Sequence, residues 1–123
     1  MQQNPVTWFE IPVNDIKKAA AFYQKVLGVS LDLNEMGGSE MAWFPVAQGA
    51  PGAAGTLIKG DSYTPSHSGS LVYFSVDDIE AALKRAGANG GKTLVPKMGI
   101  GEHGFIAHFE DCEGNRVALH SRT

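Results

Sequence analysis

The sequence predicts an α+β fold made of two repeated βαβββ modules. The segment 76–82 is a close copy of 13–19, and the same offset of 63 residues carries Gly28 onto Gly91 and Leu31 onto Leu94. In each half, the copy stands between an alternating apolar run and a helical pattern of apolar residues. Two copies fill the 123 residues, so we expect one domain over 1–123, with one module at 5–60 and the other at 69–122.

The first module begins with a strand over 6–12, where residues of alternating polarity follow one another. Asn14 is expected to cap a helix over 15–27, which Gly28 ends. Glycine-rich turns then separate three further segments that are expected to be strands: 30–34, 41–47 and 56–59.

The second module repeats this order from a strand over 71–76. Asp77 is expected to cap the second helix, and Glu80, three residues on, completes a pattern like a capping box. Gly87, Gly90 and Gly91 stop the helix. The remaining strands are predicted over three segments: 92–95, 105–109 and 116–120.

Composition excludes several classes of partner. The net charge is −3, and the ten lysines and arginines are scattered, so neither nucleic acid nor an anionic membrane is an expected partner. Residues 1–5 lack the pattern of a secretory leader, and no apolar run approaches the roughly 18 residues of a membrane span. Cys112 is the single cysteine, which excludes an internal disulfide and fits a reducing, cytoplasmic location.

Three motifs make the chain similar to a known family. These are FYQKVLG at 22–28, FSVDD at 74–78 and EDCEGN at 110–115. Together they resemble the vicinal oxygen chelate superfamily, which comprises glyoxalases, bleomycin resistance proteins and extradiol dioxygenases. The WFEIP segment at 8–12 in the first strand and the Val95-Pro96 loop further resemble the uncharacterised glyoxalase-like branch of this superfamily. The resemblance implies strands curled around a ligand cavity, with helices on the outside. The exposed edges of the two curved modules predict a symmetric homodimer, and the resemblance points the same way.

Strand parity predicts which side chains face that cavity. The helices are expected to cover the more apolar faces, which carry Phe9, Phe44, Phe74, Phe105, Phe109, Val117 and Leu119. The opposite faces are expected to present aromatic and polar side chains to a small organic ligand. The residues on those faces are Trp8, Glu10, Trp43, Pro45, Gly55, Leu57, Leu71, Tyr73, Ile106, His108, Arg116, Ala118 and His120.

Two of these residues are candidate catalytic groups. Glu10 lies on a cavity wall between apolar neighbours, where it either contacts ligand and transfers protons or forms a structural pair with Arg116. His108 can donate to a ligand carbonyl or shuttle protons. The other candidates are ligand-binding residues, and the aromatic ones among them either stack on a flat ligand or only fill space: Trp8, Trp43, Leu57, Tyr73, Arg116 and His120. His120 is alternatively a solvated histidine at the rim.

The resemblance also implies four metal-binding positions, which metal-dependent members fill with histidine or glutamate. Here they match Trp8, Leu71, Ala118 and Gly55 or a neighbour. None of these four side chains supplies an oxygen or imidazole ligand, so no metal and no other cofactor is expected. Glu10, His108 and His120 offer a weaker alternative metal set, without any characteristic spacing.

Three further signals point away from function. The segment 99–104 matches the G-x-G-x-x-G pattern but precedes a strand, whereas a dinucleotide site needs a helix there. Cys112 lies between acids that raise a thiol pKa, which argues against a nucleophile. His67 and His103 lie in loops and are expected to be solvated.

The sequence thus predicts a metal-free, glyoxalase-like protein that binds a small organic molecule. One possibility is a metal-independent lyase or isomerase that uses Glu10 and His108 as base and acid. The other is a protein that sequesters an antibiotic or metabolite without turnover.

Overall fold

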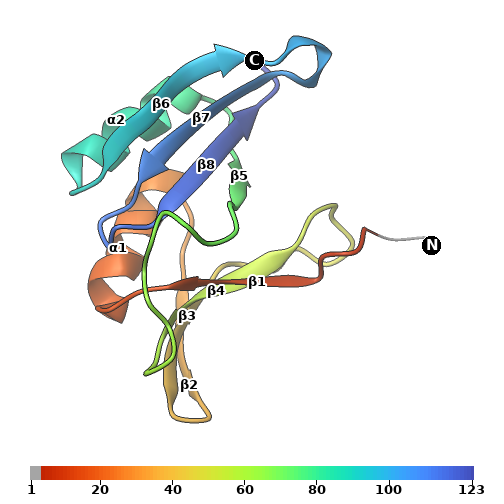
Figure 1. Ribbon diagram of the computed structural model, residues 1–123. Coiled ribbons are helices and arrows are strands. Elements are labelled where there is room, and N and C mark those ends of the chain that lie inside the picture. The colour runs from red at the N-terminus through yellow and green to blue at the C-terminus, as the bar shows by residue number, and fades with distance from the viewer. Residues whose placement is uncertain (1–3) are drawn as a thin grey trace.

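Two four-stranded mixed sheets, each accompanied by one helix, make up the structure, which is a computed structural model (Figure 1). It describes residues 4–123 and, for Met36, the backbone alone, so the expectation about residues 1–5 falls partly outside the described residues. The first module contains β1 (Trp8–Pro12), α1 (Ile16–Leu27), β2 (Asp32–Met36), β3 (Ser39–Trp43) and β4 (Ala54–Lys59). The second contains β5 (Tyr73–Ser75), α2 (Ile79–Ala88), β6 (Lys92–Gly99), β7 (Phe105–Glu110) and β8 (Arg116–Ser121).

The two sheets have the same topology, which confirms the α+β class and the repeated βαβββ modules. The strand orders are β1-β4-β3-β2 and β5-β8-β7-β6. In each sheet the first strand pairs in parallel with the fourth, and the other neighbours are antiparallel. Within one chain the strands form two separate sheets, not one curved sheet around a cavity.

Each helix is capped one residue later than the sequence suggested. Asp15 and Asp78, in place of Asn14 and Asp77, have extended backbones, and their carboxylates accept the N–H of Lys18 at 3.1 Å and of Ala81 at 3.0 Å. In both cases the expected cap and the actual cap are adjacent polar residues, so the sequence pattern does not separate them. Among the described residues, neither helix has the length and apolar character needed to cross a membrane.

Strand β6 is longer than predicted and passes through a proline. It runs from Lys92 to Gly99, and its pairing with β7 shifts register between Val95 and Met98. Pro96 lies at this irregularity, where its missing N–H costs no ladder hydrogen bond. A short 3-10 helix, Gly101–His103, follows in place of the helix that a dinucleotide fingerprint would need.

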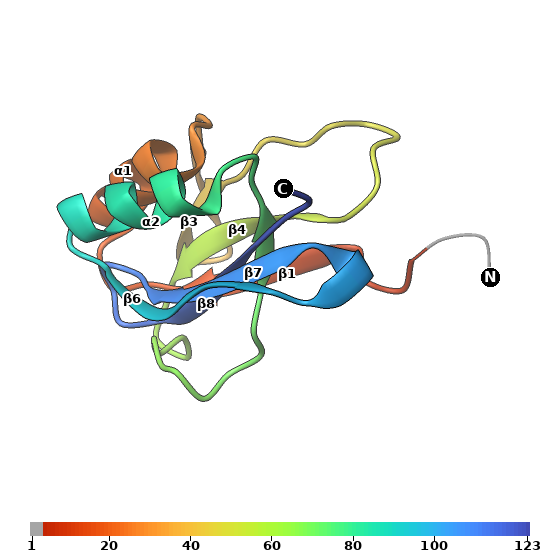
Figure 2. The ribbon, with the colours of Figure 1, turned by 90° about the horizontal axis from the view of Figure 1, so that it is seen from above.

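The core is shared by the two modules. The rings of Phe9 and Phe74 lie 5.8 Å apart between centroids, and Phe44 lies 5.3 Å from Phe74 and 5.7 Å from Tyr23 in α1. These rings and Phe109 therefore lie on the helix side of their sheets, as predicted. The two helices run side by side over this core (Figure 2). Because the core joins the helix-side faces, the other two faces point away from each other.

The predicted parity of β4 is wrong by one residue. Gly55 pairs with Phe9 and Leu57 pairs with Ile11, and directly paired residues lie on the same face of a sheet. Leu57 is fully buried in the core. Its side chain cannot contact a ligand, so its predicted binding role is incorrect. Gly55 likewise faces the core, where a Cβ atom would come within 2.5 Å of Phe9.

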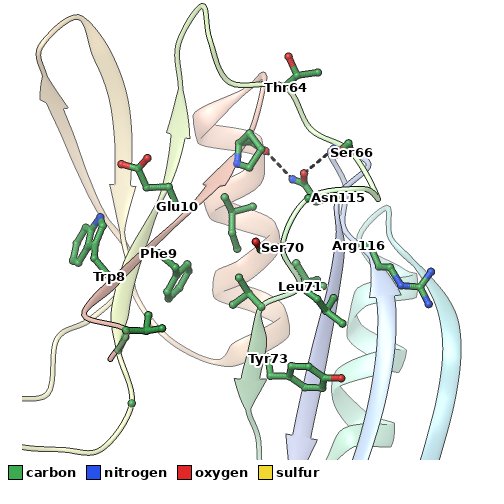
Figure 3. A pocket seen from close by; sticks show the side chains of 18 of the residues that line it. Trp8, Phe9, Glu10, Thr64, Ser66, Ser70, Leu71, Tyr73, Asn115 and Arg116 are labelled. Carbon is green, nitrogen blue, oxygen red and sulfur yellow. Dashed lines mark hydrogen bonds between the residues drawn. The ribbon is translucent and has the colours of Figure 1, made fainter. Parts of the chain in front are cut away.

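A turn of the second module fastens the first module in place. The carboxylate of Glu113 accepts the backbone N–H groups of Asn14 and Asp15 at the start of α1. The amide of Asn115 donates to the carbonyl of Pro12 over 2.7 Å and accepts the N–H of Ser66 over 3.1 Å (Figure 3). The segment 111–115 therefore ties β1, α1 and the connection before β5 to one point.

Candidate functional site

Each sheet leaves one face without a helix, and equivalent rows of residues cross these two faces. In the first sheet the row is Glu10, Thr56 and Trp43, which pair in that order. In the second sheet the equivalent row is Tyr73, Ala118 and His108. We call these surfaces the first open face and the second open face. Except for Leu57, every predicted site residue lies on the predicted side of its strand.

The first open face carries an aromatic pair beside a carboxylate. Trp8 and Trp43 pack edge to face, with centroids 5.5 Å apart and an interplanar angle of 75°. The indole N–H of Trp43 donates to the sulfur of Met41 over 3.3 Å. Glu10 is exposed, and one carboxylate oxygen accepts the hydroxyl of Tyr63 over 3.1 Å. This hydrogen bond raises the pKa of Tyr63, because phenolate would lose its partner and face a negative charge.

The second open face carries a chain of three polar side chains. The guanidinium of Arg116 approaches Nδ1 of His108 with its Nε at 3.1 Å and its Nη2 at 3.0 Å. A guanidinium only donates, so Nδ1 is the acceptor and the neutral imidazole carries its proton on Nε2. Nε2 lies 3.4 Å from the hydroxyl oxygen of Tyr73 and donates its proton to that oxygen. The hydroxyl proton of Tyr73 therefore points outward, where it can be donated to a ligand.

The charge state of His108 follows from the same surroundings. Its partial burial and the positive charge of Arg116 both lower its pKa below the ordinary value of 6.5. The imidazole is therefore neutral at pH 7. At this pH the three hydrogen-bonded side chains therefore offer donors to a ligand. The positive charge among them stays on Arg116.

Two other histidines also have partners on or near this face. Nε2 of His120 lies 2.6 Å from the carbonyl oxygen of His103, so His120 donates there and holds the 3-10 helix against the sheet. It is a tethered residue and not a free rim histidine. His67, expected to be solvated, lies 2.8 Å from the carboxylate of Glu110.

A groove of about 730 Å³ separates β1 from the connection that leads into β5 (Figure 3). Four predicted site residues line it: Trp8, Glu10, Tyr73 and Arg116. The other four do not: Trp43, Leu57, His108 and His120. Within the size range of ligand pockets, this groove is large enough for a small organic molecule.

The side chains of the two open faces do not converge within one chain. Trp8 and Glu10 point to one side of the groove, whereas Tyr73 and Arg116 point to the opposite side (Figure 3). Consequently Glu10 and His108 do not face one shared cavity within a single chain, so the predicted shared cavity requires two chains. The alternative ion pair between Glu10 and Arg116 is also absent from the described residues, since Arg116 binds His108 instead.

The side chains at the four matched positions do not fit the metal site that the resemblance implies. With the corrected register, the fourth metal position is Thr56, the equivalent of Ala118. Thr56 is buried, and its hydroxyl lies 3.0 Å from the carbonyl oxygen of Ala42. Trp8 and Leu71 offer no suitable donor. In the part of the chain that the structure describes, no three His, Cys, Asp or Glu side chains gather into a metal site.

Cys112 is also unsuited to chemistry. Its half-buried thiol lies between Asp111 and Glu113, and burial, followed by these two negative charges, raises its pKa to about 11. The thiolate that would act as a nucleophile is therefore scarce at neutral pH.

Sequence reasoning missed three residues that shape the open faces. The register error placed Gly55 and Leu57 on the open face in place of Thr56, although a threonine within this mostly apolar strand is a polar signal in the sequence. Tyr63 and His67 lie in the long connection between the modules, where no periodicity indicates which way a side chain points.

Comparisons with known proteins agree with this architecture. Residues 6–119 match the family model described as the Glyoxalase/Bleomycin resistance protein/Dioxygenase superfamily. A glyoxylase-like domain-containing protein from Didymella fabae is 30% identical over 121 residues, which cover 95% of this chain and 93% of that protein.

Two solved structures show the same fold. Glyoxalase I from Zea mays superposes with a TM-score of 0.68 at 21% identity, covering 96% of this chain and 46% of that one, so this chain spans about half of the maize enzyme. A fosfomycin resistance protein from Listeria monocytogenes superposes with a TM-score of 0.68 at 19% identity, covering 100% of this chain and 94% of that one.

Proposed function

Because the chain belongs to the Glyoxalase/Bleomycin resistance protein/Dioxygenase superfamily, we propose that it binds a small organic molecule between a first and a second open face. One observation carries the proposal: equivalent rows on the two sheets present an aromatic and acidic set, Glu10 with Trp43, and a donor set, Tyr73 with His108. Aromatic walls with a few placed polar groups are typical of ligand sites.

The binding site is completed in a symmetric homodimer. Each chain has one first open face and one second open face that point apart, so a two-fold axis can oppose the first face of one copy to the second face of the other. This arrangement also covers Trp8 and Tyr73, which are 39% and 48% exposed in the single chain. The contact involves β1, β5 and the 49–70 region, and buries well over ~1,000 Å².

Two measurements test this function. A thermal-shift screen against aldehyde adducts, aromatic metabolites and antibiotics identifies ligands by the stabilisation they give to the folded state. Light scattering at several protein concentrations gives the oligomeric state, and a single-chain mass at high micromolar protein would rule out the homodimer.

A mixing experiment then locates the site. A chain with Trp8→Ala and Glu10→Gln has a defective first face, and a chain with Tyr73→Phe and Arg116→Met has a defective second face. Each alone is expected to bind poorly, whereas subunits exchanged between them regain part of the binding, because one site of each mixed dimer is intact. No recovery in verified mixed dimers would place the site within one chain.

The exposed carboxylate of Glu10 favours a second candidate, a metal-independent lyase or isomerase. In that case Glu10 accepts a proton, while His108, protonated on Nε2, acts from the opposite subunit through the Tyr73 hydroxyl to which it is hydrogen-bonded. NMR of a ligand found in the screen distinguishes the two functions. Sequestration leaves the ligand unchanged over hours, whereas catalysis gives product that Glu10→Gln abolishes.

A further inference from the structure

The first open face has the composition of a cation-binding surface. Two indole rings meet at 75°, with centroids 5.5 Å apart, and Glu10 projects from the same face of β1 as Trp8. Trp43 reaches the same place from β3, because both it and Glu10 pair with Thr56. The three side chains therefore surround one patch of the sheet.

The electrostatics of this patch favour positive charge. The face of an indole ring is negative because of its quadrupole, and indole is the strongest cation-binding ring among the aromatic side chains. The Glu10 carboxylate adds a full negative charge. No lysine, arginine or histidine among residues 4–123 lies within 4.0 Å of it, so its counter-charge does not come from the described part of its own chain.

We infer that this face binds an organic cation, an alkylated ammonium group that lies against Trp8 and Trp43 beside Glu10. An alkylated ammonium suits the patch better than a bare one, since its methyl groups cover the rings while its charge faces the carboxylate. This inference rests on the proposed function and names the class of molecule that the site accepts. The partner's second open face, which carries the positive charge of Arg116, contacts the remainder of the same ligand, away from the ammonium group, through hydrogen-bond donors.

The protein reports on this face through its own fluorescence. It contains two tryptophans, and both belong to the patch. We therefore choose choline as the probe and, as its matched control, the neutral tert-butyl analogue in which carbon replaces nitrogen. The full chain is titrated with each compound, and tryptophan emission reports binding. The two affinities show the effect of the positive charge, because the two compounds have the same shape.

Choline is expected to give a saturable change in emission and to bind about three- to tenfold more tightly than the neutral analogue, the range of a cation–π contact assisted by a carboxylate. Glu10→Gln should remove most of this preference. Glu35→Gln is the control variant, because it removes one exposed carboxylate from the opposite face of the same sheet and should leave the preference intact. Light scattering checks that both variants keep the wild-type assembly.

The outcomes separate this inference from the proposed function. Equal or tighter binding of the neutral analogue, or an unchanged preference in Glu10→Gln, overturns the cation site while small-molecule binding stands. The same holds if neither probe binds but neutral aromatic compounds raise the melting temperature. If no compound binds in either experiment, both the cation site and the proposed function fail.

Discussion

The hydroxyl of Tyr23 in α1 donates a 2.5 Å hydrogen bond to Oδ2 of Asp111, which belongs to the second module. Both side chains are buried. The other carboxylate oxygen of Asp111 accepts the backbone N–H groups of Glu113 and Asn115, at 2.9 Å each. The pair thus links the first helix to the turn that holds the start of that helix.

This pair makes the fold sensitive to alkali. Burial, followed by the charge of Asp111 and the hydrogen bond to it, raises the pKa of Tyr23 well above 10.0. A raised pKa in the folded state favours the protonated form, so this contribution to stability is complete below pH 10 and is lost as the pH rises further. Tyr23→Phe should abolish this pH dependence and lower the free energy of unfolding at pH 7 by about 1–3 kcal/mol.

Denaturant melts of the wild type and Tyr23→Phe between pH 7 and 11 check this prediction. Tyr63→Phe serves as the control, because its hydroxyl bonds to exposed Glu10 and should contribute little to stability. An equally steep alkaline loss in Tyr23→Phe would mean that another group is responsible.

Gly55 is required by the close approach of β1 and β4. A Cβ atom there would lie 2.5 Å from the backbone oxygen of Phe9 and 2.5 Å from its ring. The backbone oxygen cannot move without breaking the parallel pairing, so Gly55→Ala should destabilise the fold by about 1–3 kcal/mol. Gly69→Ala should be near neutral, since nothing lies within 4 Å of its Cβ position. Similar melting temperatures for the two variants would argue against the β4 register described above.

Arg116 sets the protonation of His108. Removing the guanidinium removes one of the two causes that lower the pKa of His108, so Arg116→Met should raise this pKa. Because the depressed pKa penalises folding once the imidazole is protonated, the wild type should lose stability as the pH falls below about 6.5, and Arg116→Met should lose less.

NMR titration of the histidine ring resonances measures this change and also reports the tautomer. Lys97→Met removes a cation that lies over Phe105, 4.6 Å from its ring centroid, and should leave His108 unaffected. A His108 pKa that stays the same in Arg116→Met would contradict the hydrogen-bond chain.

Purified protein is expected to contain no stoichiometric transition metal, since the matched positions Trp8, Thr56, Leu71 and Ala118 do not form a donor set. Nickel and zinc should therefore not support glyoxalase activity. Elemental analysis after dialysis against a weak chelator measures the metal content. About one tightly held ion per chain, required for activity, would contradict this prediction.

Strand parity was a reliable guide to the second module and an unreliable one to β4. The offset of 63 holds at the helix caps Asp15 and Asp78, but the separation is 65 from Trp43 to His108 and 62 from Thr56 to Ala118. A change of two residues keeps the parity, whereas a change of one reverses it. Loop lengths differ between the two modules. The sequence alone does not show at which loop residues were inserted or deleted, and so it does not show which strands are shifted in register.

The direction of the open faces also lay beyond the sequence. The alternation of apolar and polar residues shows that Glu10 and Tyr73 lie on the faces of their strands away from the apolar side chains. It does not show how the two sheets pack against each other. That relation depends on the contact between Phe9 and Phe74, which pairs residues from different modules. Tertiary packing of this kind has no period in the sequence.

The hydrogen bonds from segment 111–115 to the first module have a consequence for biosynthesis. The backbone N–H groups that begin α1 bind Glu113, almost a hundred residues later, and the carbonyl that ends β1 binds Asn115. While the chain is being made, these groups stay in water until segment 111–115 has been made and has folded. Strand β8 follows this segment and lies between β5 and β7, so the second sheet forms only once β8 is present. We therefore expect chains that stop before residue 111 to be cut readily by protease within 12–16, and the full chain to be resistant there.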